Sequence, residues 1–176
     1  RDQSWEEDAP VVARLREAGA VLLGKTTTPE FAWKAVCDSP LTGITRNPWD
    51  TRTTPGGSSG GAAAAAALGM GWLHQGSDGG GSIRIPAALT GIVGLKPSFG
   101  RVPIWPPTVQ GTLSHTGPMT RTVEDAALML NAIAGPDARD WMALPHEARD
   151  WRIGLHEGVR GLRIAASPTL GFVRDL

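Results

Sequence analysis

Two serine- and glycine-rich segments contain the residues of this sequence that could do chemistry. They are residues 56–61 (GGSSGG) and residues 76–84 (GSDGGGSIR). Glycines permit backbone conformations closed to other residues, and their N–H groups can converge on an anion, as an oxyanion hole requires. Taken singly, each segment could equally be a Gly/Ser turn that caps a helix. The two together predict a nucleophilic serine beside an anion-binding turn formed by Gly79, Gly80 and Gly81.

Two common motifs match the sequence formally but not in context. Residues 19–26 fit the P-loop pattern, yet apolar residues 20–23 fill the loop and a Thr-rich stretch ending at Pro29 replaces the expected helix. Residues 56–60 fit G-x-S-x-G, the nucleophile elbow, but a polar loop precedes them where an elbow needs a buried strand. Neither nucleotide binding nor an α/β-hydrolase is the favoured interpretation.

The histidines offer an alternative source of a general base. None of the four has a distinctive neighbourhood, and His74, on a predicted strand, is expected to be a packed side chain; the others are His115, His146 and His156. A Ser-His arrangement therefore stays a minor alternative.

In their wider context, the two segments resemble the amidase signature family. The resemblance covers about residues 11–140 and follows the family's order. It is carried by residues 24–26 (GKT), 29–31 (PEF), 45–49 (TRNPW), 55–61 (PGGSSGG), 76–86 (GSDGGGSIRIP), 94–97 (GLKP) and 117–125 (GPMTRTVED).

The resemblance implies a Ser, cis-Ser, Lys triad. Ser82 would be the nucleophile and Ser58 the bridging serine, with a cis peptide bond between Gly57 and Ser58. A serine hydroxyl needs a base to take its proton, and a buried lysine can be that base because desolvation lowers its pKa. Ser58 would relay the proton to this lysine and help return it to the leaving amine.

Other residues of the two segments would support this chemistry. By the same resemblance, the N–H groups of residues 79–82 would hold the tetrahedral oxyanion. Ser59 would support Ser58, and Asp78 would pair with Arg84 to brace the turn. No cofactor or metal is implied.

The lysine of the triad is not identifiable. Lys25, Lys34 and Lys96 are the only lysines, and each occupies a motif position that is not the catalytic one in the family, whose base lies farther upstream. The chain begins at Arg1 and ends without an obvious terminus. We therefore expect residues 1–176 to be an incomplete domain that lacks an N-terminal part with the lysine and a C-terminal part, and to be inactive alone.

The elements that must position these residues are read from periodicity and turn residues. The periodicity and the turn residues predict an α/β fold with a mixed sheet flanked by helices. We expect a helix capped by Asp8 with Pro10 in its first turn and Gly19 at its end, a buried strand at 20–23, a long ordered loop at 38–61, an alanine-rich helix at 62–67, strands at 72–75 and 91–95, a helix at 122–134, a surface excursion at 136–160 and a strand at 162–166.

The composition of the chain limits the kinds of binding partner that we expect. The 17 basic and 17 acidic side chains give no reason to expect nucleic acid or an anionic membrane, and no apolar run is long enough to span a bilayer. Cys37 is alone, which fits a reducing, cytoplasmic location. The expected partner is a small-molecule amide, with a homodimer as a further possibility.

Two interpretations compete with a stand-alone amidase. One is the amidase subunit of a tRNA-dependent amidotransferase, although residues 29–33 and Gly79 look more like the general amidases. The other is a non-catalytic module that kept the fold. Trp33, Trp72 and Trp105 could line an apolar acyl pocket, but packing is the commoner fate of a tryptophan.

Overall fold

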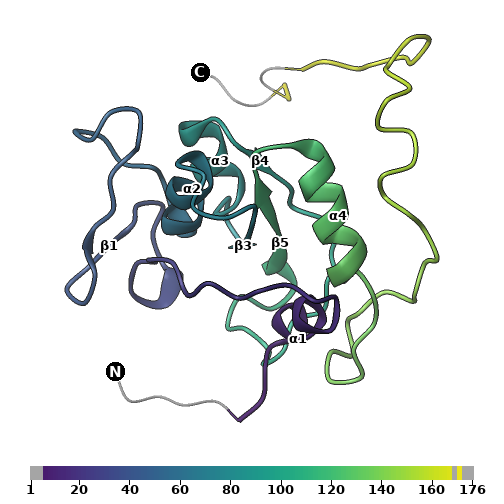
Figure 1. The fold of residues 1–176 in the computed structure, drawn as a ribbon, viewed down its shortest axis with the longest axis horizontal. Coiled ribbons are helices and arrows are strands. Elements are labelled where there is room, and N and C mark those ends of the chain that lie inside the picture. The colour runs from purple at the N-terminus through teal and green to yellow at the C-terminus, as the bar shows by residue number, and fades with distance from the viewer. Residues whose placement is uncertain (1–5, 168–169, 172–176) are drawn as a thin grey trace.

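A small antiparallel sheet forms the centre of the fold. The computed structural model describes residues 6–167 and 170–171 (Figure 1). The sheet has the order β3 (Leu73–Asp78), β5 (His115–Thr120) and β4 (Val93–Gly94), so β5 lies between two strands that run opposite to it. Every pairing in the described residues is antiparallel.

Helices cover both faces of this sheet (Figure 1). On one side, α2 (Gly60–Ala67) and α3 (Arg84–Thr90) pack around a core of Ala62, Ala63, Ile83 and Met119. On the other side, α4 (Val123–Ile133) lies against the strands and α1 (Pro10–Glu17) against α4. Their shared core contains Val11, Leu15, Val102, Met129, Leu130 and Ile133. The predicted α/β fold of a sheet flanked by helices is confirmed.

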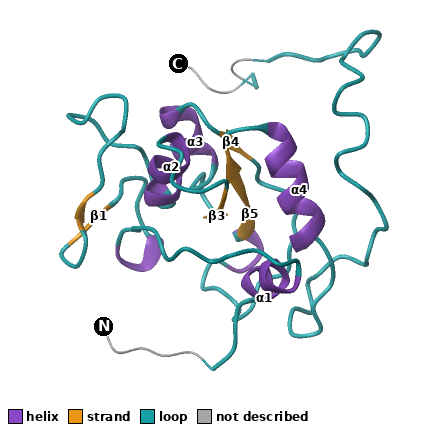
Figure 2. Ribbon diagram, viewed as in Figure 1, coloured by secondary structure: helices purple, strands orange, loops and turns teal. Residues whose placement is uncertain are grey.

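Long loops connect these elements (Figure 2). The loop before α2 holds a short hairpin of β1 (Asp38–Ser39) and β2 (Gly43–Ile44), and 3-10 turns lie at Glu30–Ala32 and Gly111–Leu113. After α4, residues 134–167 run around the outside without regular structure, which agrees with the predicted surface excursion at 136–160. No helix of the described part is long and apolar enough to cross a membrane.

The predicted helices are present, but the N-cap predicted for α1 is wrong. Pro10 opens α1 as expected, but Ala9 occupies its N-cap without a side-chain bond. Asp8 instead forms an ion pair with Arg16 at 2.9 Å, so its carboxylate stabilises the helix from the side. In α4, Thr122 is the N-cap and accepts a hydrogen bond from the Asp125 N–H at 3.1 Å.

The alanine-rich helix is α2. Small side chains let other segments approach it closely. The Gly61 N–H donates to the carbonyl oxygen of Thr27 at 3.2 Å, and a Cβ at Gly61 would lie 2.4 Å from that oxygen. The helix is thereby buried from its first turn and fixes the loop that precedes it.

The strands predicted at 20–23 and 162–166 are wrong. Both segments lack regular structure, and most of their apolar side chains are exposed: 83% for Val21 and 74% for Ile164. A strand needs a neighbouring strand for its N–H and C=O groups. Among the described residues, neither segment pairs with one.

The sequence prediction also missed β5 and α3. Gly117 and Pro118 are poor strand formers, and a proline is rarely found inside a central strand. Here Pro118 pairs with Gln75 of β3, and its carbonyl accepts from the Leu95 N–H at 3.0 Å. Tertiary pairing thus overrides local preference in the central strand.

Candidate active site

Asp78 organises the turn that carries Ser82. The turn runs from the end of β3 to the start of α3, and the Asp78 side chain inside it is fully buried. Its carboxylate accepts from the N–H groups of Gly81 at 2.8 Å, Ile83 at 3.2 Å and Arg84 at 3.3 Å. The Arg84 guanidinium adds two bonds of 2.9 Å. The predicted Asp78–Arg84 pair is therefore present, and it holds the backbone on both sides of Ser82.

The charge of Asp78 is stabilised by these bonds. Burial alone would raise the pKa of the carboxyl, but the hydrogen bonds from the side chain and backbone of Arg84 and from the Ile83 N–H outweigh it and lower the pKa below its usual value. Asp78 is thus an ionised acceptor inside the turn, with its oxygens occupied by the protein.

The second serine segment lies directly against this turn. The Gly57–Ser58 peptide is cis, as predicted, and Ser58 is 2% exposed. Ser59 makes the connection: its N–H donates to the Ser82 carbonyl oxygen at 3.3 Å. Its hydroxyl accepts from the Ser77 N–H at 3.2 Å and donates to the Ser77 carbonyl oxygen at 3.3 Å. Ser59 therefore ties the Ser58 loop to β3 and to the Ser82 turn.

Gly57 allows the loop to reach this position. A Cβ at Gly57 would lie 2.6 Å from the carbonyl oxygen and 2.8 Å from the nitrogen of Val36. These are backbone atoms, which cannot rotate away as a side-chain end could. The close approach of the residue 36 backbone thus requires glycine beside Ser58.

The turn leaves backbone donors near Ser82. The Gly81 N–H is already bound to Asp78. In the described part of the chain, the N–H groups of Gly79, Gly80 and Ser82 have no protein acceptor. Gly80 is exposed and Ser82 half-buried. In the described structure these three N–H groups are therefore free to donate a hydrogen bond to a bound group.

No base for Ser82 appears among the described residues. The Ser58 and Ser82 hydroxyls share no hydrogen bond there, and none of the three lysines donates to either. Lys25 is exposed, Lys34 forms an ion pair with Asp38 at 2.8 Å, and the Lys96 Nζ donates to the Pro97 carbonyl oxygen at 3.4 Å.

The histidines do not replace the lysine. His74 lies on β3 with its Nε2 buried and unbonded in the described structure, and burial lowers its pKa. The Nδ1 of His115 lies 2.8 Å from the Leu113 carbonyl oxygen and 3.2 Å from that of Asp78. Neither histidine bonds to Ser82, and His115 instead supports the strand end from which the turn begins.

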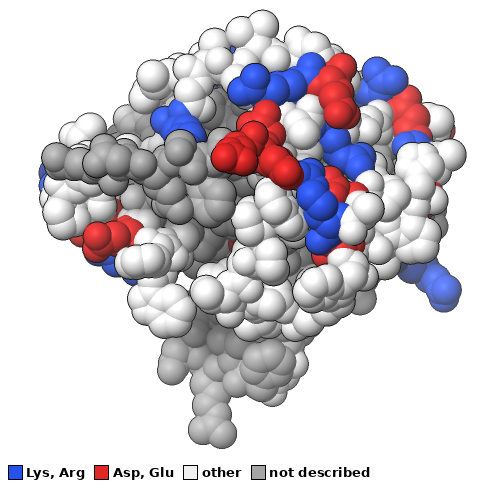
Figure 3. All heavy atoms as spheres, turned by 90° about the horizontal axis from the view of Figure 1, so that it is seen from below, with Lys and Arg blue, Asp and Glu red and all other residues white. Residues whose placement is uncertain are grey.

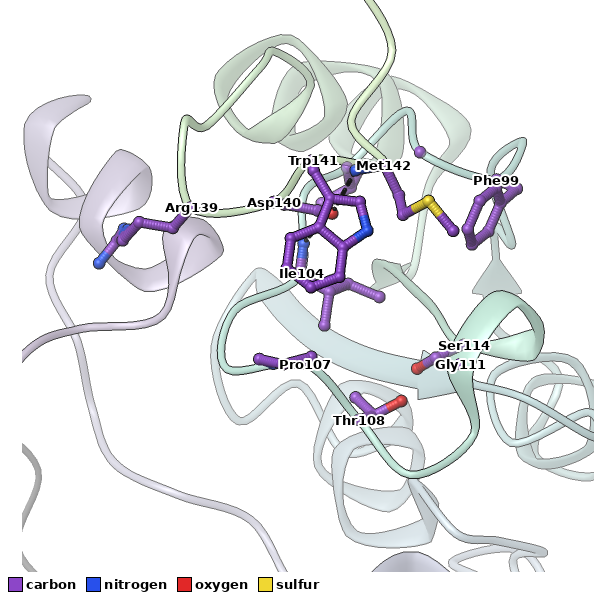
Figure 4. A pocket seen from close by; sticks show the side chains of 12 residues that line it. Phe99, Ile104, Pro107, Thr108, Gly111, Ser114, Arg139, Asp140, Trp141 and Met142 are labelled. Carbon is purple, nitrogen blue, oxygen red and sulfur yellow. Dashed lines mark hydrogen bonds between the residues drawn. The ribbon is translucent and has the colours of Figure 1, made fainter.

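An apolar cavity of about 130 Å³ is lined in part by the loop that leads into β5. Figure 4 shows Trp141, Met142 and Phe99 on one side of it and Pro107, Thr108 and Ser114 on the other. Ser58 and Ser82 do not line it. The same loop contributes Gln110, which lies against Gly79 and which the sequence prediction did not include.

The three tryptophans proposed for an acyl pocket have separate environments. The ring of Trp72 faces the Arg121 guanidinium at 5.0 Å, and that of Trp105 faces Arg139 at 4.7 Å. Trp33 is 80% exposed. The three side chains therefore do not line a common pocket.

The surface charges are balanced locally. On the face seen in Figure 3, acidic and basic side chains lie interspersed, without a segregated patch of either sign. Ion pairs such as Arg139 with Glu7 at 2.9 Å and Arg152 with Asp150 at 2.8 Å show the same pairing. Within the described residues, no group of three or more His, Cys, Asp or Glu side chains could hold a metal ion.

The Asp78-braced turn thus presents Ser82 beside N–H groups that have no acceptor among the described residues, and Ser59 joins this turn to the cis-peptide loop of Ser58. The chain belongs to the Amidase family, whose model matches residues 2–175. The predicted membership in the amidase signature family is confirmed.

Relatives and solved structures agree with this assignment. An acylamidase of Rhodococcus erythropolis is 48% identical over 167 residues, which cover 93% of this chain and 35% of that protein. A glutamyl-tRNA(Gln) amidotransferase subunit of Syntrophobacter fumaroxidans is 49% identical over 158 residues, or 89% of this chain and 32% of the relative. The structure of a bacterial aryl acylamidase of the amidase signature enzymes matches with a TM-score of 0.81 at 39% identity. The match covers 89% of this chain and 32% of that chain. The chain thus spans about a third of the length of the proteins it matches.

Proposed function

We propose that this chain carries the nucleophile-bearing part of an amidase that hydrolyses a carboxamide C–N bond through an acyl-enzyme on Ser82. The observation that carries the proposal is the Asp78-braced turn, in which the N–H groups of Gly79, Gly80 and Ser82 have no acceptor among the described residues. Membership in the family supports the same reaction.

In the proposed reaction, Ser82 Oγ attacks the amide carbonyl carbon. The tetrahedral oxyanion is held by the N–H groups of Gly79, Gly80 and Ser82, each typically worth about 3 to 4 kcal/mol in the transition state. Ser58 passes the proton of Ser82 to a base and later to the leaving amine, and water then cleaves the acyl-enzyme. Asp78 and Arg84 support the turn without touching the substrate.

The base of this reaction is proposed to lie outside the 176 residues. Among the described residues none of the three lysines donates a hydrogen bond to either serine, and the chain spans about a third of the length of its relatives. We therefore expect the chain alone to hydrolyse amides poorly or not at all. That residues 1–176 are an incomplete domain is part of the same proposal.

A subunit of an amidotransferase is the second candidate. Its supporting observation is the 49% identity to a glutamyl-tRNA(Gln) amidotransferase subunit. In that case glutamine would be the amide, and the ammonia released would pass to a partner protein. The remaining alternative is a non-catalytic module, and the intact serines and turn argue against it.

Location and assembly are further predictions. Cys37 is buried and unpaired, which supports a reducing compartment such as the cytoplasm. A small-molecule amide stays the expected partner, without nucleic acid or membrane, and a homodimer stays a possibility.

The test uses an activated ester, because a nitrophenolate leaves without a proton and so depends less on the missing base. With p-nitrophenyl acetate, the Ser82 Oγ–acyl bond forms as the ester C–O bond breaks, the hydroxyl proton passes to water, and nitrophenolate leaves. We expect the wild-type chain to release one equivalent of nitrophenolate and to leave an unactivated anilide intact.

Two variants decide the outcome. Ser82→Ala should abolish this release, whereas Ser98→Ala, at an exposed serine of a different loop, should keep it. Equal release by Ser82→Ala and wild type would reject Ser82 as the nucleophile.

A further inference from the structure

The side chain of Gln110 covers one face of the Ser82 turn. A Cβ placed on Gly79 would lie 2.4 Å from Gln110 Oε1, 2.9 Å from Cδ and 3.3 Å from Nε2. All three nearest atoms thus belong to the carboxamide. Gln110 and Gly79 are therefore in direct contact, and the glycine leaves the space that the carboxamide occupies.

The carboxamide of Gln110 is free to bond. Within residues 6–167 its Oε1 and Nε2 have no hydrogen-bond partner, and only the backbone of Gln110 is bonded. A carboxamide offers two donor hydrogens and an acceptor oxygen. Gln110 is half-buried, so this capacity lies at the rim of the turn and not in bulk solvent.

The backbone around Gln110 is held in place. Its N–H donates to Thr108 Oγ1 at 3.3 Å, and its carbonyl oxygen accepts from the Leu113 N–H at 3.1 Å in the 3-10 turn. Farther along the same loop, the His115 ring contacts the Asp78 carbonyl oxygen. The loop is therefore attached to the strand end that starts the Ser82 turn.

The side of the turn next to Gln110 is open. A Cβ on Gly80 would meet no atom within 4 Å, and the N–H groups of Gly79 and Gly80 are unbonded in the described structure. A carbonyl bound at these N–H groups would thus have the Gln110 carboxamide as a neighbour among the described residues.

We propose that Gln110 determines specificity at the Ser82 site by hydrogen-bonding a polar group of the substrate, such as an amide, beside the scissile carbonyl. The proposal rests on the proposed acyl transfer to Ser82. A polar group of the site that bonds a substrate group discriminates against an analogue that lacks the substrate group. With such an analogue, the polar group of the site is desolvated without a hydrogen-bond partner. The favoured substrates are therefore acyl groups that carry an amide near the carbonyl that is attacked.

The test compares two p-nitrophenyl esters of the same chain length, N-acetylglycine and pentanoate. They differ in that the first has an amide where the second has two methylene groups. The measured quantity is the ratio of their rates of Ser82 acylation, each corrected for spontaneous hydrolysis. We expect this ratio to fall about three- to tenfold in Gln110→Ala and in Gln110→Met, which keeps the length without the amide. Thr112→Ala, at an exposed residue of the same 3-10 turn, should leave the ratio unchanged.

The outcomes separate this proposal from the one on which it rests. No acylation of wild-type Ser82 by either ester would refute the proposed function, and this inference with it. Acylation of Ser82 with the same ratio in wild type and both Gln110 variants would refute only the specificity role. An equal fall of both rates would likewise refute it, since Gln110 would then act on the oxyanion common to both esters.

Discussion

The Ser82 turn and the apolar segment at 20–23 contrast in what holds a stretch of chain in place. The turn is made of polar and glycine residues, yet Asp78 is fully buried and each of its carboxylate oxygens is bonded. The segment at 20–23 is made of strong strand formers, yet Val21 is 83% and Leu23 79% exposed. A buried polar group with all its partners fixes backbone more firmly here than an apolar run without a neighbour.

The contrast predicts where substitutions act. Substitutions of the buried carboxylate and of the closely packed glycines should unfold or distort the site. Substitutions in the exposed apolar segments should leave the stability nearly unchanged.

Within the candidate site, the largest effect is expected at Asp78. In Asp78→Ala, the N–H groups of Gly81 and Ile83 lose a charged acceptor in a buried place, and we expect the free energy of unfolding to fall by about 3 kcal/mol. Asp50→Ala is the matched control, since Asp50 makes the same two-bond contact with Arg52 on the surface. Urea unfolding measures both. A comparable loss in the two variants would show that burial of the pair is unimportant.

The next largest loss of stability is expected at Gly57. A Cβ there would collide with the Val36 backbone, so Gly57→Ala should cost about 1 to 3 kcal/mol through forced backbone shifts. Gly80→Ala adds the same atom where nothing lies within 4 Å and should leave the unfolding midpoint unchanged. Equal stability of the two variants would contradict the close packing of the Ser58 loop.

The pH dependence of stability should report on Asp78. Because its pKa is lower in the folded chain than the usual 3.8, the ionised carboxylate contributes stability above about pH 4, and the contribution is lost as the pH falls through the lowered pKa. The stability difference between wild type and Asp78→Asn should thus be constant near neutral pH and shrink below about pH 4. A difference that grows on acidification would contradict this assignment of the charge.

The smallest effect is expected in the exposed apolar segments. Val21→Ser and Ile164→Ser should each change the free energy of unfolding by no more than about 0.5 kcal/mol, because neither side chain is buried. Ile133→Ala in the α4 core, expected to cost about 2 to 5 kcal/mol, shows what burial adds. A loss above about 1 kcal/mol for Val21→Ser would mean that this segment is packed in solution.

Local signals in the sequence predicted part of this structure. The alanine run specified α2, and the serine-glycine spacing, with the family resemblance, placed Ser58 in a cis peptide and paired Asp78 with Arg84. These features depend on residues close in sequence or on a motif shared by relatives.

Other features depend on contacts that the sequence does not encode locally. The β5 strand contains Pro118 and forms because two strands flank it. Ser59 bonds Ser77 across the fold, and Gln110 reaches Gly79 from a loop with no pattern of its own. Conversely, residues 20–23 have the right composition for a strand, but no described strand pairs with them.

The most direct test of the account is the position of the acyl group. After treatment with p-nitrophenyl acetate, the wild-type chain should carry one acetyl group, and peptide mass spectrometry should place it on Ser82. Asp78→Ala should lose most of this labelling. An acetyl group on Ser58, on a surface lysine, or equally on Ser82 in wild type and Asp78→Ala would contradict the claim that the Asp78-braced turn makes Ser82 the nucleophile.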